Sequence, residues 1–314
     1  MTQELSERAG LAVDKSLNVC MTLLRQKRFV EVEAILRQTL KVDPGNSAVL
    51  NLLGYVTTGK QNEDEVLGFL RQALENTPDC SMTHNNIAGC YANRGEFDKA
   101  IEHARRAVDL DPSSAILWNT LGIQYKKDAQ TSKAIECFQK SLEIDRDPYV
   151  MVNLGNTYAD KLSFNAAMHW CYRALDIQPG ISGAHICLAY CHHIRGEMEE
   201  GWREYEHRIY HFAQLIAYMS IMGEEKKWDG HASLEGKRVL VFCEQGFGDA
   251  INFVRYVKEL KKLGCHIILN CSEPLGRLFE HVEGVDEIFL KDDVFTGHKP
   301  VFDYHLPMLS LPCC

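Results

Sequence analysis

The spacing of prolines constrains this chain more than any other feature of its sequence. Pro44, Pro78 and Pro112 are 34 residues apart, and Pro179 continues the series after one slightly altered repeat. Proline ends a helix, because it lacks the N–H that the helix needs and its ring clashes with the preceding turn. The chain is therefore expected to repeat one helical unit, with a proline at the end of each copy.

Aligning the sequence on these prolines brings other residues into register. A large aliphatic residue followed by glycine or alanine recurs, and a tyrosine follows three residues later in several copies. Small residues let two helices approach closely, and large residues fill the space beside them. The aligned positions are Leu53-Gly54, Ile87-Ala88, Leu121-Gly122, Leu154-Gly155 and Leu188-Ala189, then Tyr91, Tyr125 and Tyr158, then Val66, Ala100, Ala134 and Ala167, and last Ala73, Ala107, Ser141 and Ala174.

This pattern resembles the tetratricopeptide repeat (TPR), a helix–turn–helix unit of about 34 residues. Generic helical hairpins are the alternative, but they would not keep so many positions aligned. Because one unit cannot bury its apolar face alone, neighbouring units stack into a solenoid. We expect an N-terminal tail at 1–12, a TPR solenoid at 13–212 and a linker helix or loop at 213–236. The solenoid would hold about six units, at 13–46, 47–80, 81–114, 115–147, 148–181 and a divergent last unit from 182.

Asparagine recurs on the first helix of the expected units. Side-chain amides donate and accept hydrogen bonds, so a row of them can hold the backbone of an extended peptide without reading its sequence. The row resembles the asparagine ladder in the TPR superhelix of O-linked N-acetylglucosamine transferase, which implies a protein or peptide partner in the concave groove. The alternative is that these are ordinary solvated positions. The residues are Asn51, Asn85 and Asn119 at 34-residue spacing, with Asn86, Asn153 and Asn156 close by.

The pattern changes after residue 236 from helices alone to alternating strands and helices. A strand is expected at 238–243, where the apolar run that follows Arg238 is typical of a buried parallel strand. A helix is expected at 250–263, with Ile251, Val254, Val257 and Leu260 along one face. The alternation predicts βαβ crossovers and a parallel sheet, and hence a partial α/β Rossmann-like domain at 237–314. Its further elements are a strand at 266–271, a helix at 274–282, a strand at 285–290 and a candidate fourth strand at 302–306.

Several short motifs, in a fixed order, accompany this change. They are GWREYEHR, WDG, LEGKRVLV, EQGFGD, RY and FDYHLPMLSLP. Their order resembles bacterial proteins that join TPR repeats to a glycosyltransferase-like domain. That domain is similar to the heptosyltransferases, enzymes of the two-domain GT-B architecture. The resemblance implies that residues 237–314 correspond to the acceptor-side half of such an enzyme.

The loop EQGFGD at 244–249 has a structural and a functional interpretation. In the first, Gly246 and Gly248 permit a tight strand-to-helix turn, and Asp249 caps the helix. In the second, the loop lies outside the carboxyl end of a strand, where open α/β sheets bind ligands. The resemblance implies that Asp249 is the general base for an acceptor hydroxyl. It also implies that Glu244, Gln245 and the two glycines contact the acceptor.

The donor half of a GT-B enzyme, which binds the nucleotide-sugar, does not occur before Cys314. No other phosphate-binding loop is present, and no cofactor is expected. Three hypotheses follow: an interaction scaffold with a truncated transferase half, a fragment of an active glycosyltransferase, or the acceptor side of a split enzyme. We favour the scaffold, for which a nucleotide-sugar would bind only if a donor domain were supplied.

Composition excludes several other classes of function. Acidic residues outnumber basic ones, 43 against 34, which disfavours nucleic acid as the partner. No apolar run reaches the roughly 20 residues that span a bilayer, and the polar N-terminus predicts a cytoplasmic protein. The 12 cysteines form no C-x-x-C pair and are expected to be mostly buried thiols. No metal is expected, since repeat packing accounts for the one dense cluster, which comprises His185, Cys187, Cys191, His192 and His193.

Overall fold

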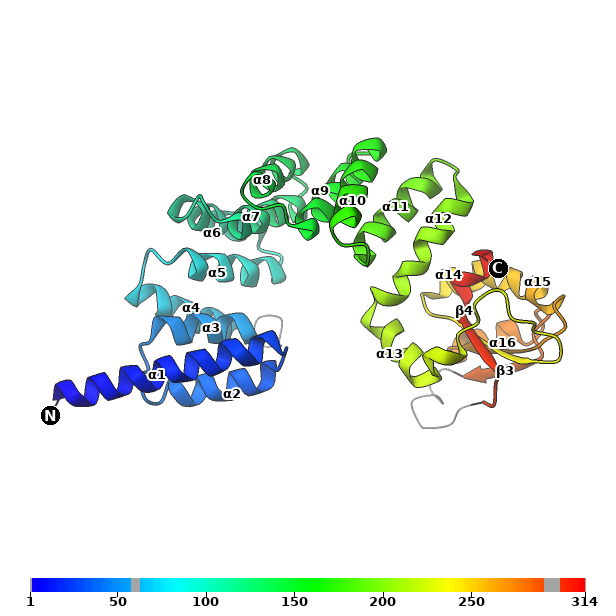
Figure 1. Cartoon of the computed structure of the whole chain (residues 1–314), viewed down its shortest axis with the longest axis horizontal. Helices are drawn as coiled ribbons and strands as arrows, with labels where there is room; N and C mark the ends of the chain where they lie inside the picture. The colour runs from blue at the N-terminus through cyan, green and yellow to red at the C-terminus, as the bar shows by residue number, and fades with distance from the viewer. Residues whose placement is uncertain (1, 58–62, 291–299, 314) are drawn as a thin grey trace. The chain divides into compact units, whose positions relative to one another are not determined.

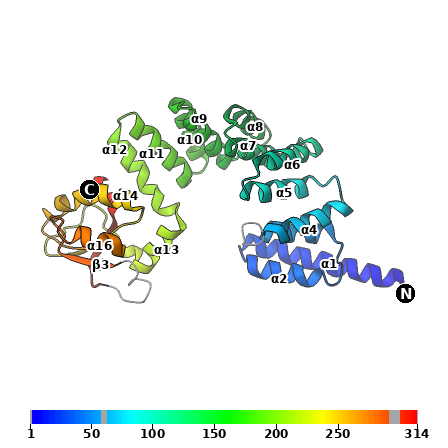
Figure 2. The ribbon, with the colours of Figure 1, turned by 180° about the vertical axis from the view of Figure 1, so that it is seen from behind.

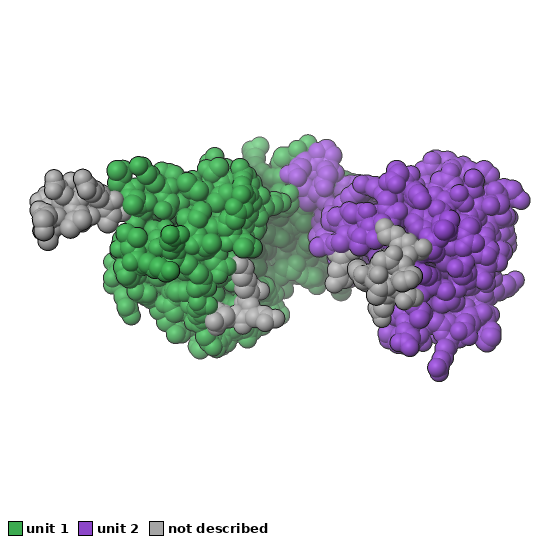
Figure 3. Space-filling view, turned by 90° about the horizontal axis from the view of Figure 1, so that it is seen from below, with its two compact units in different colours: residues 1–177 green, residues 178–314 purple. Residues whose placement is uncertain are grey.

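Two compact units make up the protein. The computed structural model describes residues 2–57, 63–290 and 300–313. The chain divides into a first unit of residues 1–177 and a second unit of residues 178–314 (Figure 3). The described part of the first unit is helical, and the second unit adds a small parallel sheet to its helices. The predicted fold class, a mostly helical solenoid followed by a small part with a parallel sheet, is confirmed.

The first unit consists of helical hairpins, which follow one another along the chain (Figures 1 and 2). Four predicted repeat starts, at residues 47, 81, 115 and 148, coincide with the first residues of helices. The first helices of the hairpins are α1 (Thr2–Arg25), α3 (Ser47–Thr57), α5 (Ser81–Asn93), α7 (Ala115–Lys127) and α9 (Pro148–Asp160). The second helices are α2 (Phe29–Thr39), α4 (Glu63–Asn76), α6 (Phe97–Leu110), α8 (Thr131–Ile144) and α10 (Phe164–Ile177).

Aligned small residues mark the closest contacts between the two helices of a hairpin. At three hairpins the residue is glycine, and a Cβ there would collide with a side chain of the second helix. In the hairpin of α5 and α6 the aligned residue is Ala88, which is fully buried. The Cβ would lie 2.5 Å from Leu70 at Gly54, 2.7 Å from Phe138 at Gly122 and 2.8 Å from Cys171 at Gly155.

The backbone carbonyls of the aligned tyrosines accept the hydrogen bonds that terminate the first helices. In the hairpin of α9 and α10, Leu162 adopts a φ of 59°, and the N–H of Ser163 donates back to the carbonyl of Tyr158 at 2.9 Å. This is the Schellman pattern, which satisfies a carbonyl that the helix leaves without a partner. The same bond recurs from Glu96 to Tyr91 at 2.9 Å and from Gln130 to Tyr125 at 2.8 Å.

The second unit begins with one more hairpin and continues into the sheet. Its helical segments before the sheet are α11 (Ser182–Ile194), α12 (Met198–Tyr205), η1 (Glu206–Tyr210), α13 (Ala213–Met222) and η2 (Glu224–Lys226). The strands are β1 (Arg238–Phe242), β2 (His266–Cys271), β3 (Glu287–Leu290) and β4 (Tyr304–Pro307). The helical segments among them are α14 (Phe247–Phe253), η3 (Val254–Tyr256), α15 (Val257–Lys261), α16 (Glu273–Phe279) and η4 (Met308–Cys313).

All neighbouring strands of the sheet are parallel, in the order β3-β2-β1-β4. Successive residues of β1 point to opposite faces. Val239 and Val241 join a core with residues of α14, α15 and α16, whereas Leu240 and Phe242 join a second core with residues of α13. Both faces of the sheet are therefore covered, which explains the unbroken apolar run of this strand.

The segment 213–236, expected as a linker, supplies part of this cover. Tyr218 of α13 is buried against the sheet, and its hydroxyl donates to Oδ1 of Asn270 on β2 at 2.7 Å. Trp228 belongs to the core on the opposite face, and its backbone N–H donates to the carbonyl of His305 at 3.0 Å. A helix that covers a sheet and a helix that links two domains can have the same apolar sequence pattern. The sequence alone therefore did not show that this segment packs on the sheet.

Two boundaries differ from those expected. Helix α1 begins at Thr2, so the described part of the predicted tail at 1–12 is helical. The boundary between the units follows Ile177, one hairpin earlier than the predicted end of the solenoid at residue 212. The last hairpin belongs to the second unit because α12 packs against η4. Trp202 on α12 also contacts Phe253 on α14, with ring centroids 5.3 Å apart.

The helix predicted at 250–263 is interrupted. The chain forms α14, one 3₁₀ turn in η3 and then α15, and Val254, Val257 and Leu260 are buried as expected. Ile251 is 50% exposed, so its predicted place on the apolar face was wrong. On an α-helix a spacing of three residues falls about 60° short of a full turn, so three such steps place Ile251 on the side opposite Leu260. In residues 2–57, 63–290 and 300–313, no helix has both the length and the apolar character that crossing a membrane requires.

Candidate functional site

Four of the predicted asparagines meet in pairs across neighbouring repeats. Asn86 on α5 donates from Nδ2 to Oδ1 of Asn51 on α3 at 2.7 Å. Asn153 on α9 donates in the same way to Asn119 on α7 at 3.1 Å. Each pair keeps an amide N–H group and a carbonyl lone pair for a further partner. We call the surface of α3, α5, α7 and α9 that carries these residues the first-helix face; it also carries the half-buried Asn156.

A groove on the first-helix face surrounds the fifth asparagine, Asn85. The groove has a volume of ≈ 560 Å³, and none of the described residues that line it is charged. Oδ1 of Asn85 is enclosed and has no hydrogen-bond partner in the described part of the chain. A buried acceptor without a donor destabilises the protein unless a ligand supplies an N–H or O–H. The residues that line the groove are Phe29, Tyr55, Val56, Asn85, Asn86, Gly89 and Thr120.

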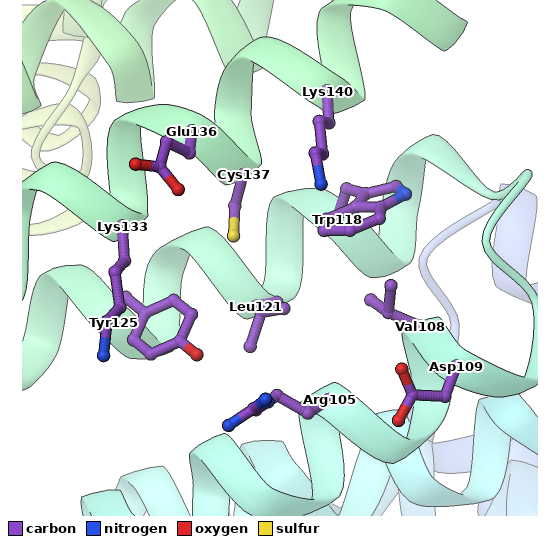
Figure 4. A pocket seen from close by; sticks show the side chains of 10 residues that line it. All are labelled: Arg105, Val108, Asp109, Trp118, Leu121, Tyr125, Lys133, Glu136, Cys137 and Lys140. Carbon is purple, nitrogen blue, oxygen red and sulfur yellow. The ribbon is translucent and has the colours of Figure 1, made fainter.

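A second cavity of ≈ 290 Å³ lies between α6, α7 and α8 (Figure 4). Trp118 and Tyr125 project into it from α7, and lysines of α8 cover both rings. Nζ of Lys140 lies 4.3 Å from the ring centroid of Trp118, and Nζ of Lys133 lies 5.3 Å from that of Tyr125. These are cation–π contacts, and the ring of Trp118 is further fixed by its N–H, which donates to the carbonyl of Pro112 at 2.9 Å.

The sequence did not reveal this cavity, because its residues come from three helices. A signal was present, since Trp118, Leu121 and Tyr125 recur at helical spacing on α7, but such a stripe usually packs in a core. The thiol of Cys137 also lines the cavity, and burial raises its pKa to about 11. It stays protonated at neutral pH and is therefore a poor nucleophile.

The order of the strands defines a candidate site in the second unit. The chain places β2 on one side of β1 and β4 on the other. In an open α/β sheet, ligands bind at such a switch point, outside the carboxyl ends of the two strands. The loop that includes residues 244–246 follows β1, and η4 follows β4, so both segments border this place.

The guanidinium of Arg208, from η1, bridges these two segments. Its Nη2 donates to Oε1 of Glu244 at 2.7 Å and to Oγ of Ser310 at 3.0 Å. Nη1 donates to Glu206 at 2.8 Å, and the N–H of Leu309 donates to the same Glu244 oxygen at 3.1 Å. The side chains of Arg208 and Glu244 are 0% and 2% exposed. Glu244, expected from the resemblance to contact an acceptor, is thus held in a buried ion pair.

Burial governs the energetics of this ion pair. It raises the pKa of Glu244, and the Arg208 charge beside the carboxylate offsets part of the rise. Oε2 of Glu244 and Nε of Arg208 are enclosed without a partner among the described residues. A buried pair adds little net stability, but removing one member leaves the other charge unpaired in the core.

The rest of the loop is more open than Glu244. Gln245 donates from Nε2 to the hydroxyl of Tyr205 at 2.6 Å. Gly246 caps α14 with a φ of −67°, and neither it nor Gly248 has a positive φ. A Cβ at either glycine would meet nothing within 4 Å. The fold therefore does not require these two glycines, and the predicted structural reason for them was wrong.

Asp249 lies in the first turn of α14 and not at its N-cap. The predicted cap was therefore wrong, because Gly246 occupies that position and no side chain makes a cap hydrogen bond there. Asp249 is half-buried in this turn. Its role as a general base stays a prediction.

The possible metal ligands on α11 have separate partners. Nδ1 of His185 lies 2.5 Å from a carboxylate oxygen of Glu204, and Nδ1 of His192 lies 2.6 Å from one of Glu197. Within the described ranges, no group of three His, Cys, Asp or Glu side chains could hold a metal ion. The remaining members of the cluster are the buried Cys187 and Cys191, and His193, whose ring packs 4.6 Å from that of Trp202.

Comparison with solved structures identifies the fold of the helical part. TTC0263, a thermophilic TPR protein of Thermus thermophilus, has a TM-score of 0.52 at 16% identity, covering 57% of this chain and 97% of that one. Pseudomonas aeruginosa pilF has a TM-score of 0.55 at 15% identity, covering 68% of this chain and 99% of that one. At such identities the likeness shows the fold alone.

Comparison by sequence finds a family match for residues 79–147. No curated protein matches the chain. The family model described as a tetratricopeptide repeat matches residues 79–147, which span α5 to α8. The hairpins, their aligned small residues and this match agree in describing residues 79–147 as tetratricopeptide repeats.

Proposed function

We propose that the chain is an interaction scaffold that holds an extended peptide segment of a partner protein on its first-helix face. The groove at Asn85 carries this proposal, because Oδ1 of Asn85 has no hydrogen-bond donor among the described residues and Asn85 lines the groove. A backbone N–H of an extended peptide would supply one. The asparagine pairs on either side offer further donors and acceptors at the spacing of the repeats. We also propose a cytoplasmic location, which the absence of disulfides among the described cysteines supports.

A random peptide library tests this function even though the partner is unidentified. We expect the immobilised protein to enrich peptides, and a variant with Asn85→Ala and Asn119→Ala to bind the enriched peptides at least about tenfold more weakly. Both substitutions remove amide groups from the first-helix face and leave the helices intact. Fluorescence anisotropy of a labelled enriched peptide would measure the affinity, and circular dichroism would check the helicity.

Asn252→Ala provides the matched control, because Asn252 is an exposed asparagine on α14 in the second unit. This variant should bind the enriched peptides as the wild type does. Equal affinity of the double variant and the wild type would contradict the proposal, and so would a library that enriches no peptide at all.

A second function is favoured by the loop after β1. The second unit would be the acceptor side of a glycosyltransferase, with Asp249 as the base for an acceptor hydroxyl and Gln245 as a contact. Support comes from two glycines that the fold does not require, in a loop at the switch point of the sheet. A nucleotide-sugar would bind only when a donor domain is supplied.

The Arg208–Glu244 pair argues against transfer by this chain alone, because it holds Glu244, an expected acceptor contact, in hydrogen bonds between the loop and η4. We expect no measurable heat when a nucleoside-diphosphate sugar is titrated into the protein in a calorimeter. Micromolar binding would contradict this expectation and would favour the transferase. An Asp249→Asn variant serves as the control, because it should leave this result unchanged.

A further inference from the structure

We propose that the groove at Asn85 is selective for an uncharged peptide segment that inserts one aliphatic or aromatic side chain into a notch at Gly89. The inference rests on the proposed function and adds the chemical class of the bound segment. Its basis is a glycine that the fold does not need, placed among apolar and amide groups.

Neither packing nor the backbone requires glycine at position 89. A Cβ there would meet nothing within 4 Å, in contrast to Gly54 and Gly122, where it would collide with the second helix. Gly89 lies inside α5 and has no positive φ. Glycine in a helix interior is less stable than alanine, so its presence here costs stability without serving the fold.

The repeats on either side carry a side chain at the aligned position. It is Tyr55 one repeat before and Ile123 one repeat after, each 34 residues from Gly89. Tyr55 lines the same groove and is 54% exposed. The missing side chain therefore leaves a notch in the first-helix face, one helical turn from Asn85.

The described residues that line the groove around the notch carry no charge, and several of them are apolar. Phe29 and Val56 line it together with Tyr55, and Phe29 is 41% exposed. An apolar anchor would cover these surfaces and gain hydrophobic free energy. A charged anchor would lose water without meeting an opposite charge, which is unfavourable. The backbone N–H beside the anchor would then donate to Oδ1 of Asn85.

The peptide library proposed above tests this inference through its consensus. The enriched peptides should share one aliphatic or aromatic residue with uncharged neighbours. A consensus with an acidic or basic residue at its centre would overturn the inference that the notch takes an apolar side chain. The most enriched peptide, synthesised with a fluorescent label, is then the probe for variants of the full chain.

Gly89→Leu should weaken binding of this probe at least about tenfold, because the leucine fills the notch. Gly68 on α4 offers a matched control, since it is also an interior helical glycine whose Cβ would meet nothing within 4 Å. Gly68→Leu should leave the affinity unchanged. Gly89→Ala and Gly68→Ala should each raise Tm by about 1–3 °C, while only Gly89→Ala weakens binding.

The outcomes separate this inference from the function on which it rests. Weaker binding by both the asparagine double variant and Gly89→Leu supports the groove and the notch. If the asparagine variant binds weakly and Gly89→Leu binds normally, the notch is wrong and the groove stands. If neither variant changes the affinity, both proposals fail. Gly89→Ala keeps the test decisive even if leucine disturbs the helix.

Discussion

Replacing Arg208 with methionine is expected to lower the free energy of unfolding of the second unit by about 3–5 kcal/mol. The substitution keeps an apolar chain of similar length but leaves the Glu244 carboxylate, 2% exposed, without its countercharge. Hydrogen exchange of the β1 amides in increasing urea would report the loss in this unit separately from the first.

The pH dependence of the same variant provides a second check. Without Arg208, burial raises the pKa of Glu244 in the folded chain further, because the remaining backbone N–H of Leu309 offsets only part of the rise. An acid whose folded-state pKa is raised takes up its proton first in the folded state, so the deficit should shrink as the pH falls toward the raised pKa. A deficit that grows on acidification would contradict the assignment.

A double variant separates the missing partner from the missing contacts. Arg208→Met combined with Glu244→Leu removes both charges, and it should recover most of the lost stability because no unpaired charge remains. If Arg208→Met alone stays within about 1 kcal/mol of the wild type, the pair does not hold η1 to the loop after β1.

Replacing Phe138 with alanine is expected to lower the free energy of unfolding of the first unit by about 3–5 kcal/mol. The ring is fully buried in the first unit, where it fills the space directly over Gly122. Thermal unfolding followed by circular dichroism should show a lower midpoint and a lower free energy of unfolding.

Gly122 supplies the complementary change. Gly122→Ala alone should lower the free energy of unfolding by about 1–3 kcal/mol, because the new Cβ would lie 2.7 Å from Phe138. In the Phe138→Ala background the same methyl group enters the vacated space. The double variant should therefore lose less free energy of unfolding than the two single variants lose together. Simple additivity would show that the two residues do not share a packing site.

The helical hairpins were predictable because their signals are local. Proline positions and aligned small residues lie within one repeat, and they set helix starts such as Ser81 and Ala115. The strand predicted at 266–271 also matched β2 at both ends, since a buried parallel strand is a continuous apolar run. The interrupted helix after β1 was not predictable, because tertiary packing decides where a helix tightens.

The candidate sites depended on contacts between distant residues, which the sequence does not display. The sequence shows the row of asparagines. It does not show that Asn51 pairs with Asn86, because this depends on the rotation between neighbouring repeats. Arg208 and Glu244 both stood in motifs, yet 36 residues separate them. The notch at Gly89 was hidden for another reason: an interior glycine is informative only when the space around its missing Cβ is known.

One measurement tests the central claim most directly, which is that a peptide binds on the first-helix face. The anchor residue of the most enriched peptide is replaced with a benzophenone-bearing residue, the complex is irradiated, and the adduct is located by mass spectrometry. We predict adducts on α3, α5 or α7 at the residues that line the groove, such as Tyr55 and Thr120. Adducts confined to the cavity between α6 and α8, or to the second unit, would contradict the account.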